Sequence, residues 1–473
     1  MSKNPYKNLV NNSIAFTIAN IGSKVISFIM VPLYTYVLAT EQYGTIDVMM
    51  TMNSLLLPIV FLCLSDAVLR YTMDKRYDKA DVLTAATKVY LVSFVVICCL
   101  LPILAYIKPE LKDYLYLFGL LFMLNGVSTL MSQFLRATGH IKAYAANGVF
   151  YTFVFASMNI LFLVFLNLGV TGYLLSSIVA DVIRILVAVI VSKSWRYISF
   201  SNNSKAILKM MLYYSLPLIP NALMWWVMDA SDKFVILLFC GIEANGLYAV
   251  SKKLPTLIDT FHGIFNQAWQ LSAIEENDNE KILEFTTQIY KYYIVFLSLI
   301  ASIIVFVSRP FIYLLGESYH SSWKYIPFLV VSVVFSSVSG FLSSKLIANE
   351  KTKFILKTTI IGALANIVMN FILIPIFGIN GAGFATMASF FIVWKLRESL
   401  LIKIGYLNVV SSKLIFILIA FEIIIYYLPS LIISELLMGS CVVLLLYMNK
   451  STIIELLLPI FNKGKRLIKR RER

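Results

Sequence analysis

The stretch that decides the fold is residues 12–38, NSIAFTIANIGSKVISFIMVPLYTYVL, an apolar run long enough to cross the hydrocarbon core of a bilayer, about 30 Å, as a helix. Polar residues recur through it at steps of four, three, four and three, so on a helix they line one face. These are Ser13, Thr17, Asn20, Lys24 and Ser27. A lysine at the bilayer centre costs about 2.5–3.5 kcal/mol on insertion scales, and such residues usually face a bundle interior or a water-filled path. The stretch therefore predicts a first membrane span with Lys24 on a hydrated face.

The composition puts the whole chain in the membrane class. Of its 473 residues, 59% are hydrophobic and 14% are charged, which excludes a soluble globular protein. The cysteines lie in apolar segments without a CxxC pair, so the sequence favours buried small side chains over a disulfide framework or a metal cluster. We therefore expect no metal site and no cofactor. The five cysteines are Cys63, Cys98, Cys99, Cys240 and Cys441.

Apolar segments with short connections recur along the chain and predict an all-α polytopic membrane protein with about 14 transmembrane helices. Lysine and arginine gather in every second connection, except for the acidic one at residues 275–281, and in the C-terminal tail. The positive-inside rule, in which acidic residues count little, therefore puts both termini in the cytoplasm. Most of the net charge of +15 therefore reflects membrane topology, and no nucleic-acid partner is expected. The predicted spans are residues 13–38, 45–70, 87–107, 114–135, 143–166, 173–192, 211–230, 244–268, 286–308, 324–345, 354–376, 380–401, 411–429 and 432–449.

The chain also repeats itself. Glu41 and Gly44 recur as Glu243 and Gly246 at an offset of 202 residues, and further matches follow at offsets of 209 and 211. Two homologous six-span halves are therefore predicted. Six is even, so both halves have the same orientation in the membrane, an arrangement typical of transporters with a site between the halves. The predicted divisions are a lobe at 1–205, a lobe at 206–405, two further helices at 406–450 and a basic cytoplasmic tail at 451–473.

A second polar stripe lies in the predicted eighth span. Lys252, Asp259, His262 and Asn266 are spaced by seven, three and four residues, which places them on one helical face. Pro255 follows Lys252 closely and removes a backbone donor. A bend is expected there, and also at Pro217 and Pro220 in the seventh span.

Cations on such faces favour an anionic substrate, because phosphate oxygens accept charge-assisted hydrogen bonds from lysine and arginine. Lys24 is the first candidate, since the first span holds no acid to pair with it. Lys252 ranks second because Asp259 lies two turns away, and Arg70 is either a ligand or an ordinary charge at the end of a span. The predicted substrate-binding residues of a central cavity are Asn20, Lys24, Arg70, Asn221, Lys252 and His262.

Three motifs carry a resemblance to a known family. They are Glu41-Gln-Tyr-Gly44, Leu64-Ser-Asp-Ala-Val-Leu-Arg-Tyr71, and Tyr214-Ser-Leu-Pro-Leu-Ile-Pro220 running on to Asp232-Lys-Phe. In motif order and span count the chain resembles the Wzx-type oligosaccharide flippases of the multidrug, oligosaccharidyl-lipid and polysaccharide exporter superfamily.

The resemblance implies a mechanism and partners. Such proteins have two six-helix lobes around a cavity and move undecaprenyl-pyrophosphate-linked repeat units across the bacterial plasma membrane, driven by an ion gradient. Lys24, Arg70 and Lys252 would then meet the lipid pyrophosphate. The implied partners are the lipid-linked oligosaccharide, membrane lipids, and a polysaccharide polymerase or assembly proteins. The candidates for coupling to Na⁺ or H⁺ are Asp47, Asp229, Asp232 and Asp259.

Other classes remain in competition with this interpretation. Lipid II flippases also have fourteen spans and basic cavities. Cation-coupled drug exporters usually use membrane-embedded acids, and here the first span has none. A membrane glycosyltransferase or polymerase needs a sizeable external loop, but the external connections here are short. The chain has three histidines, which are scattered along the sequence: His140, His262 and His320. We therefore expect a transporter and no enzyme. A channel fits bent helices and paired lobes less well than alternating access does.

Overall fold

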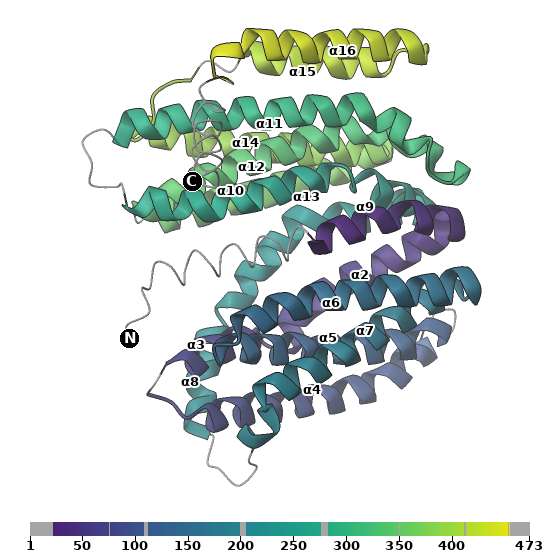
Figure 1. The fold of residues 1–473 in the computed structure, drawn as a ribbon, viewed down its shortest axis with the longest axis vertical. Coiled ribbons are helices and arrows are strands. Elements are labelled where there is room, and N and C mark those ends of the chain that lie inside the picture. The colour runs from purple at the N-terminus through teal and green to yellow at the C-terminus, as the bar shows by residue number, and fades with distance from the viewer. Residues whose placement is uncertain are drawn as a thin grey trace, which may run out of the picture. The chain divides into compact units, whose positions relative to one another are not determined.

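A computed structural model describes residues 22–74, 76–107, 112–198, 205–275, 282–349, 351–410, 413–452 and 454. Within these residues every regular element is a helix (Figure 1). Eleven helical segments are long and apolar enough to cross a membrane, and two shorter apolar helices, Gly22–Val37 and Leu414–Tyr426, accompany them. The predicted all-α polytopic fold is confirmed.

The first helices follow the predicted spans closely. Gly22–Val37 is the described part of the first span. The next elements are α2 (Thr40–Val60), α3 (Leu64–Met73), α4 (Lys79–Ile107), α5 (Lys112–Ala137), α6 (Ile141–Asn159), the π-helical turn η2 (Ile160–Phe165), α7 (Gly169–Ser192) and the short η3 (Ser194–Tyr197).

The predicted second span, residues 45–70, is two helices and not one. Pro58 lies inside the last turn of α2, where it cannot donate a helical hydrogen bond. Beyond it, Leu62 and Cys63 have left-handed backbone, with φ of 53° and 50°. The chain therefore changes direction between α2 and α3, within an apolar stretch that hydropathy alone shows as continuous.

The seventh predicted span is shifted along the chain. Its first residues form a separate helix, α8 (Lys205–Ser215), which packs on α3 and α4. After Pro217, α9 (Leu218–Ser251) runs without interruption through the predicted connection at 231–243 as far as Gly241, whose φ of 84° and ψ of 178° break the helical path. The bend at Pro217 is confirmed. The predicted connection is too long, because Asp232, Lys233 and Glu243 belong to helix and the helical path breaks at Gly241.

The eighth span is also interrupted, as its proline predicts. Residues 252–254 form a turn, and α10 (Pro255–Glu275) starts with the proline at its first position, where a missing N–H costs nothing. Lys252 therefore lies in the turn before the helix. The predicted single helical face from Lys252 to Asn266 is wrong at its first residue.

The remaining helices pack around α12. They are α11 (Ile282–Ile312), η4 (Glu317–Tyr325), α12 (Ile326–Ala348), α13 (Thr352–Phe377) and α14 (Ile379–Lys403). α12 contacts α10, α11, α13 and α14. Its Phe341 stacks on Trp269 with ring centroids 4.4 Å apart and on Tyr293 at 5.4 Å, which fills the space between α10, α11 and α12 with aromatic rings.

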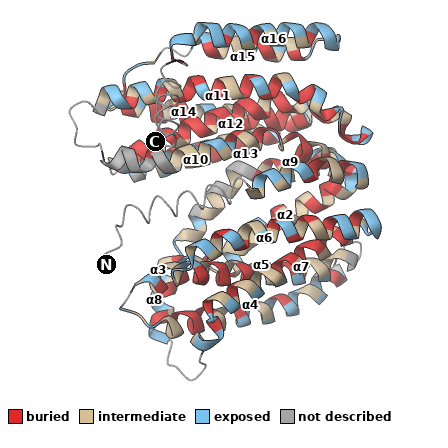
Figure 2. Ribbon diagram, in the orientation of Figure 1, coloured by how far each residue is buried: buried red, intermediate tan, exposed pale blue. Residues whose placement is uncertain are grey.

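The last two helices, α15 (Lys413–Tyr426) and α16 (Leu431–Met448), pack on each other and on α11. Exposed stretches run along both helices (Figure 2). Large apolar residues are among the exposed ones, including Ile417, Phe421 and Leu436. Such surfaces are typical of helices that face lipid.

The helices form two compact units. One contains the described residues up to Phe234 together with Ile242–Gly246, and the other contains Val235–Gly241 and the described residues from Leu247 on. The predicted lobes at 1–205 and 206–405 rest on the repeat and stay a prediction. Most of the predicted tail, residues 455–473, lies outside the described residues.

Candidate functional site

An ion pair joins two apolar helices of the first unit. Lys233 on α9 donates to Asp47 Oδ1 on α2 at 2.9 Å, and the two side chains are 15% and 16% exposed. Lys233 also donates to Thr51 Oγ1 at 3.2 Å, while Asn245 Nδ2 donates to Asp47 Oδ2 at 3.3 Å. Both carboxylate oxygens and the ammonium group of this Asp47 cluster therefore have partners, which offsets the cost of removing the charges from water.

Two glycines from the sequence repeat bring these helices into contact. A Cβ added to Gly44 would collide with the carbonyl oxygen of Ile242, and one added to Gly246 would collide with the carbonyl oxygen of Thr40. Thr40 and Ile242 are themselves 202 residues apart, as are the two glycines. The contact is therefore symmetric with respect to the repeat, and it needs glycine on both sides because the backbones touch.

Polar contacts flank this glycine contact. Thr40 Oγ1 donates to Glu243 Oε1 at 3.3 Å, and Asn245 Nδ2 lies 3.4 Å from the carbonyl oxygen of Gly44. On the other side of Asp47, the Trp226 indole N–H lies 3.2 Å from Ser54 Oγ and 3.3 Å from the carbonyl oxygen of Thr51. Residues 40–54 of α2 thus meet α9 along several turns.

Of the predicted binding residues in this unit, two are described in full. Lys24 is exposed on the helix Gly22–Val37. Arg70 is exposed, and its guanidinium carbon lies 4.8 Å from the centre of the Tyr214 ring, a cation–π contact. Asn20 lies outside the described residues, as does the side chain of Asn221.

The predicted coupling acids have different surroundings. Asp47 is the centre of the cluster above. Asp232 is buried, at 2% exposed, and its Oδ1 accepts the backbone N–H of Lys233 at 2.9 Å. Asp259 is exposed on α10, and the side chain of Asp229 lies outside the described residues.

The second unit holds the other predicted ligands. Lys252 Nζ lies 5.6 Å from the centre of the Tyr248 ring. On α10, His262 Nδ1 is hydrogen bonded to the hydroxyl of Tyr293, and Gly340 on α12 lies against its ring, where a Cβ would come within 2.7 Å of Nε2. Asn266 Oδ1 accepts from Ser344 Oγ at 2.9 Å. This face of α10 therefore packs on α11 and α12.

Arg397 is a buried cation on α14 that the sequence analysis did not single out. It is 2% exposed, and its donors reach neutral oxygens on two neighbouring helices. The bonds go to Ser339 Oγ at 2.7 Å, Ser343 Oγ at 2.6 Å, Thr358 Oγ1 at 3.0 Å and Thr359 Oγ1 at 3.0 Å. The serine hydroxyls on the polar face of α12 therefore accept hydrogen bonds from Arg397, within the same unit.

Glu422 on α15 is a second polar residue that the sequence analysis passed over. It is 1% exposed, and Ser302 Oγ on α11 donates to its Oε2 at 2.6 Å. Its Oε1 is buried and has no hydrogen-bond partner among the described residues. The signal for both Arg397 and Glu422 was available, because charged residue types inside apolar helices are rare. In the described residues no three His, Cys, Asp or Glu side chains lie close enough to form a metal site.

Comparisons with known proteins agree with this fold. A family model described as polysaccharide biosynthesis protein matches residues 9–270, and a second, MatE, matches residues 277–372. The lipid II flippase MurJ in an inward closed conformation is 16% identical and superposes with a TM-score of 0.71 over 94% of this chain and 100% of that one. An inward-facing multidrug resistance transporter of the MATE family is 13% identical, with a TM-score of 0.55 over 83% and 94% of the two chains. No curated protein sequence matches significantly.

The helical architecture defines the class, a multi-pass membrane protein whose fold is shared with the lipid II flippase and the MATE-family transporter above. Within that class, the match over residues 9–270 covers more than half of the chain. The chain belongs to the polysaccharide biosynthesis protein family.

Proposed function

We propose that the protein is a flippase that moves an undecaprenyl-pyrophosphate-linked oligosaccharide repeat unit across the bacterial plasma membrane for surface polysaccharide synthesis. The observation that carries the proposal is that the polysaccharide biosynthesis match, residues 9–270, contains a set of cations within or beside apolar helices. Cations at such positions suit a phosphate-bearing lipid, because they stabilise its charge while the lipid tail stays in the bilayer. This set comprises Lys24, Arg70, Lys233 and Lys252.

In this proposal the residues have separate roles. Lys24 and Lys252 bind the pyrophosphate with Arg70, while amide and imidazole groups at Asn20, Asn221 and His262 contact the sugars. A coupling ion, Na⁺ or H⁺, binds at one of Asp47, Asp229, Asp232 and Asp259. Lys233 competes with that ion for Asp47, since it already donates to Oδ1 at 2.9 Å.

The transport step we propose is alternating access, with both termini in the cytoplasm. The sequence repeat, in which Glu41 and Gly44 recur as Glu243 and Gly246, supports it, because paired halves of the same orientation are typical of transporters that work by alternating access. A polysaccharide polymerase or assembly proteins then use the delivered repeat unit on the other side.

A substrate panel in proteoliposomes tests the proposal. Vesicles containing the purified protein are loaded on one side with fluorescent undecaprenyl-pyrophosphate oligosaccharide, and an impermeant lectin on the other side reports its appearance. We expect ion-gradient-dependent flipping above that of protein-free vesicles. Failure to move any undecaprenyl-linked oligosaccharide while a cationic drug is exported would contradict the proposal.

Lipid II flipping is the second candidate function. The structural match to MurJ, with a TM-score of 0.71 over 94% of this chain, favours it, although that likeness concerns the fold. Both substrates share the pyrophosphate and differ in the sugar and peptide attached to it. In the same vesicles, faster flipping of lipid II than of peptide-free oligosaccharide lipids would select this second function.

A further inference from the structure

Residues spaced by four form rows along the short helix α8, and three of these rows differ in exposure and chemistry. Ile207 and Met211 are buried on α3 and α4. The next face is apolar and partly open, and the third is exposed and carries Lys205, Lys209 and Tyr213, which is 86% exposed. A helix with buried, apolar and basic faces is typical of the lipid headgroup region at the edge of a membrane.

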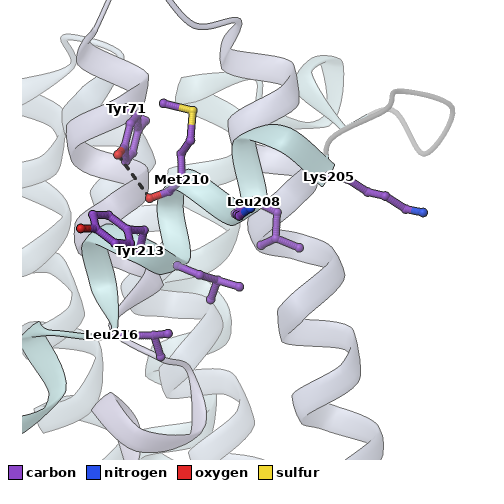
Figure 3. Close-up of a pocket in the computed structure, with 8 residues that line it drawn as sticks. Tyr71, Lys205, Leu208, Met210, Tyr213 and Leu216 are labelled. Carbon is purple, nitrogen blue, oxygen red and sulfur yellow. Dashed lines mark hydrogen bonds between the residues drawn. The ribbon is translucent and has the colours of Figure 1, made fainter.

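A groove of about 660 Å³ runs along the open apolar face (Figure 3). Leu208, Leu212 and Leu216 line it at steps of four residues, and Tyr71 from α3 lines it as well. The Tyr71 hydroxyl donates to the carbonyl oxygen of Met210 at 3.3 Å, which fixes α8 against α3. Because its walls come from two helices joined in this way, the groove is a defined feature of the fold.

The charges of the groove lie at its edge. Lys205 and Lys209 also line it, one helical turn apart, and in Figure 3 Lys205 extends outward, away from the apolar side chains. An apolar groove with two lysines among its lining residues matches the two parts of an anionic lipid. The chain takes the leucine-lined space, and the phosphate accepts charge-assisted bonds from the lysines.

We infer that this groove binds one acyl chain of an anionic phospholipid, with its phosphate held by Lys205 and Lys209. A neutral phospholipid offers the same chain but carries a compensating positive group, so it gains less from two lysines. None of the residues assigned to the proposed transport path lines the groove, although Arg70 contacts Tyr214 on the same helix, α8. The inference does not depend on which substrate is flipped.

Photolabelling of the full-length protein tests the inference. Delipidated protein is placed in nanodiscs of phosphatidylcholine that contain increasing amounts of phosphatidylglycerol with a photoreactive acyl chain. Labelled peptides are then mapped by mass spectrometry. In the Lys205→Gln/Lys209→Gln variant, we expect half-maximal labelling of residues 205–216 to need roughly 30-fold more phosphatidylglycerol than in the wild type. The variant loses two lysines, and each contributes a similar electrostatic gain in affinity for an anionic lipid.

Two further variants separate a bound lipid from general surface attraction. Lys142→Gln/Lys193→Gln removes two exposed lysines elsewhere in the same unit and should leave labelling of the groove unchanged. Leu216→Trp fills the groove and should reduce labelling although both lysines remain. The inference is overturned if photoreactive phosphatidylcholine labels the groove equally well, if the two lysine pairs behave alike, or if only a lipid-linked oligosaccharide occupies it.

Discussion

Lys233 Nζ lies 2.9 Å from Asp47 Oδ1, although 186 residues separate the two in the sequence. The pair connects α2 with α9, the two helices that carry the repeated Glu41/Gly44 and Glu243/Gly246. Removing either charge leaves the other in an apolar setting with fewer partners, which lowers the free energy of unfolding by about 1–3 kcal/mol. We therefore predict that Asp47→Asn and Lys233→Gln each destabilise this contact more than the double variant does.

A double-mutant cycle measures that coupling. Spin labels at the exposed positions 59 on α2 and 239 on α9, in a background without the five native cysteines, report the separation of the two helices by pulsed electron resonance. We expect a broadened distance distribution in each single variant and partial recovery in the double variant. Strictly additive effects of the two substitutions would show that the pair does not hold the helices together.

Glycine substitution addresses the backbone contact directly. Gly44→Ala and Gly246→Ala each place a Cβ against a carbonyl oxygen of the other helix, and overpacking of this kind costs typically about 1–3 kcal/mol. We expect either variant to shift the same spin-label distance toward larger values, and by similar amounts because the contact is symmetric. Gly148→Ala is a matched control, because nothing lies within 4 Å of a Cβ at that position. A larger shift for Gly148→Ala than for Gly44→Ala would contradict the account.

Arg397 is predicted to hold α12, α13 and α14 together. Arg397→Gln removes several charge-assisted hydrogen bonds and leaves the hydroxyl groups of Ser339 and Thr358 without their donor. The free energy of unfolding should fall by roughly 3 kcal/mol or more. Thermal unfolding in detergent should show a clearly lower transition temperature for Arg397→Gln than for the wild type. Arg196→Gln, at an exposed position, should leave it within the error of the wild type. Equal transitions for the two variants would rule out a structural role for Arg397.

Glu422 is predicted to be held as the neutral acid, because its only hydrogen-bond partner among the described residues is Ser302 and no cation contacts it there. Glu422→Gln keeps the shape and the acceptor for Ser302, so we expect a stability close to that of the wild type. Glu422→Ala opens a cavity and should cost about 2 kcal/mol or more. A loss in Glu422→Gln as large as that in Glu422→Ala, measured by thermal unfolding, would show that the charged form is needed.

The sequence predicts the fold well because hydropathy, charge distribution and proline each act locally. Span positions follow from apolar runs, and the bends at Pro217 and Pro255 follow from missing backbone donors. The predicted connection at 231–243 is too long because Lys233 looks like a charge in a loop until its partner is known. That partner, Asp47, comes from a distant helix, and no local pattern predicts it.

The candidate site is harder to predict, because the partners of its side chains come from distant parts of the chain. A turn at 252–254 removes Lys252 from the helical face that spacing alone assigns to it. On α12, Ser339 and Ser343 accept from Arg397, a partner on another helix that no local pattern predicts. Periodicity predicts which residues share a face, whereas the partner of that face depends on tertiary packing.

The most direct test of the proposed function is flipping of a lipid-linked oligosaccharide by Lys24→Gln. Three sets of proteoliposomes are prepared with equal amounts of folded protein: wild type, Lys24→Gln and the control Lys193→Gln. Under an imposed ion gradient, the amount of substrate that the lectin can reach is measured over time. Loss of a pyrophosphate ligand should lower the rate about tenfold or more in Lys24→Gln and leave Lys193→Gln unchanged. A wild-type rate in Lys24→Gln would contradict the central claim that this cation, on the first predicted span, binds the substrate.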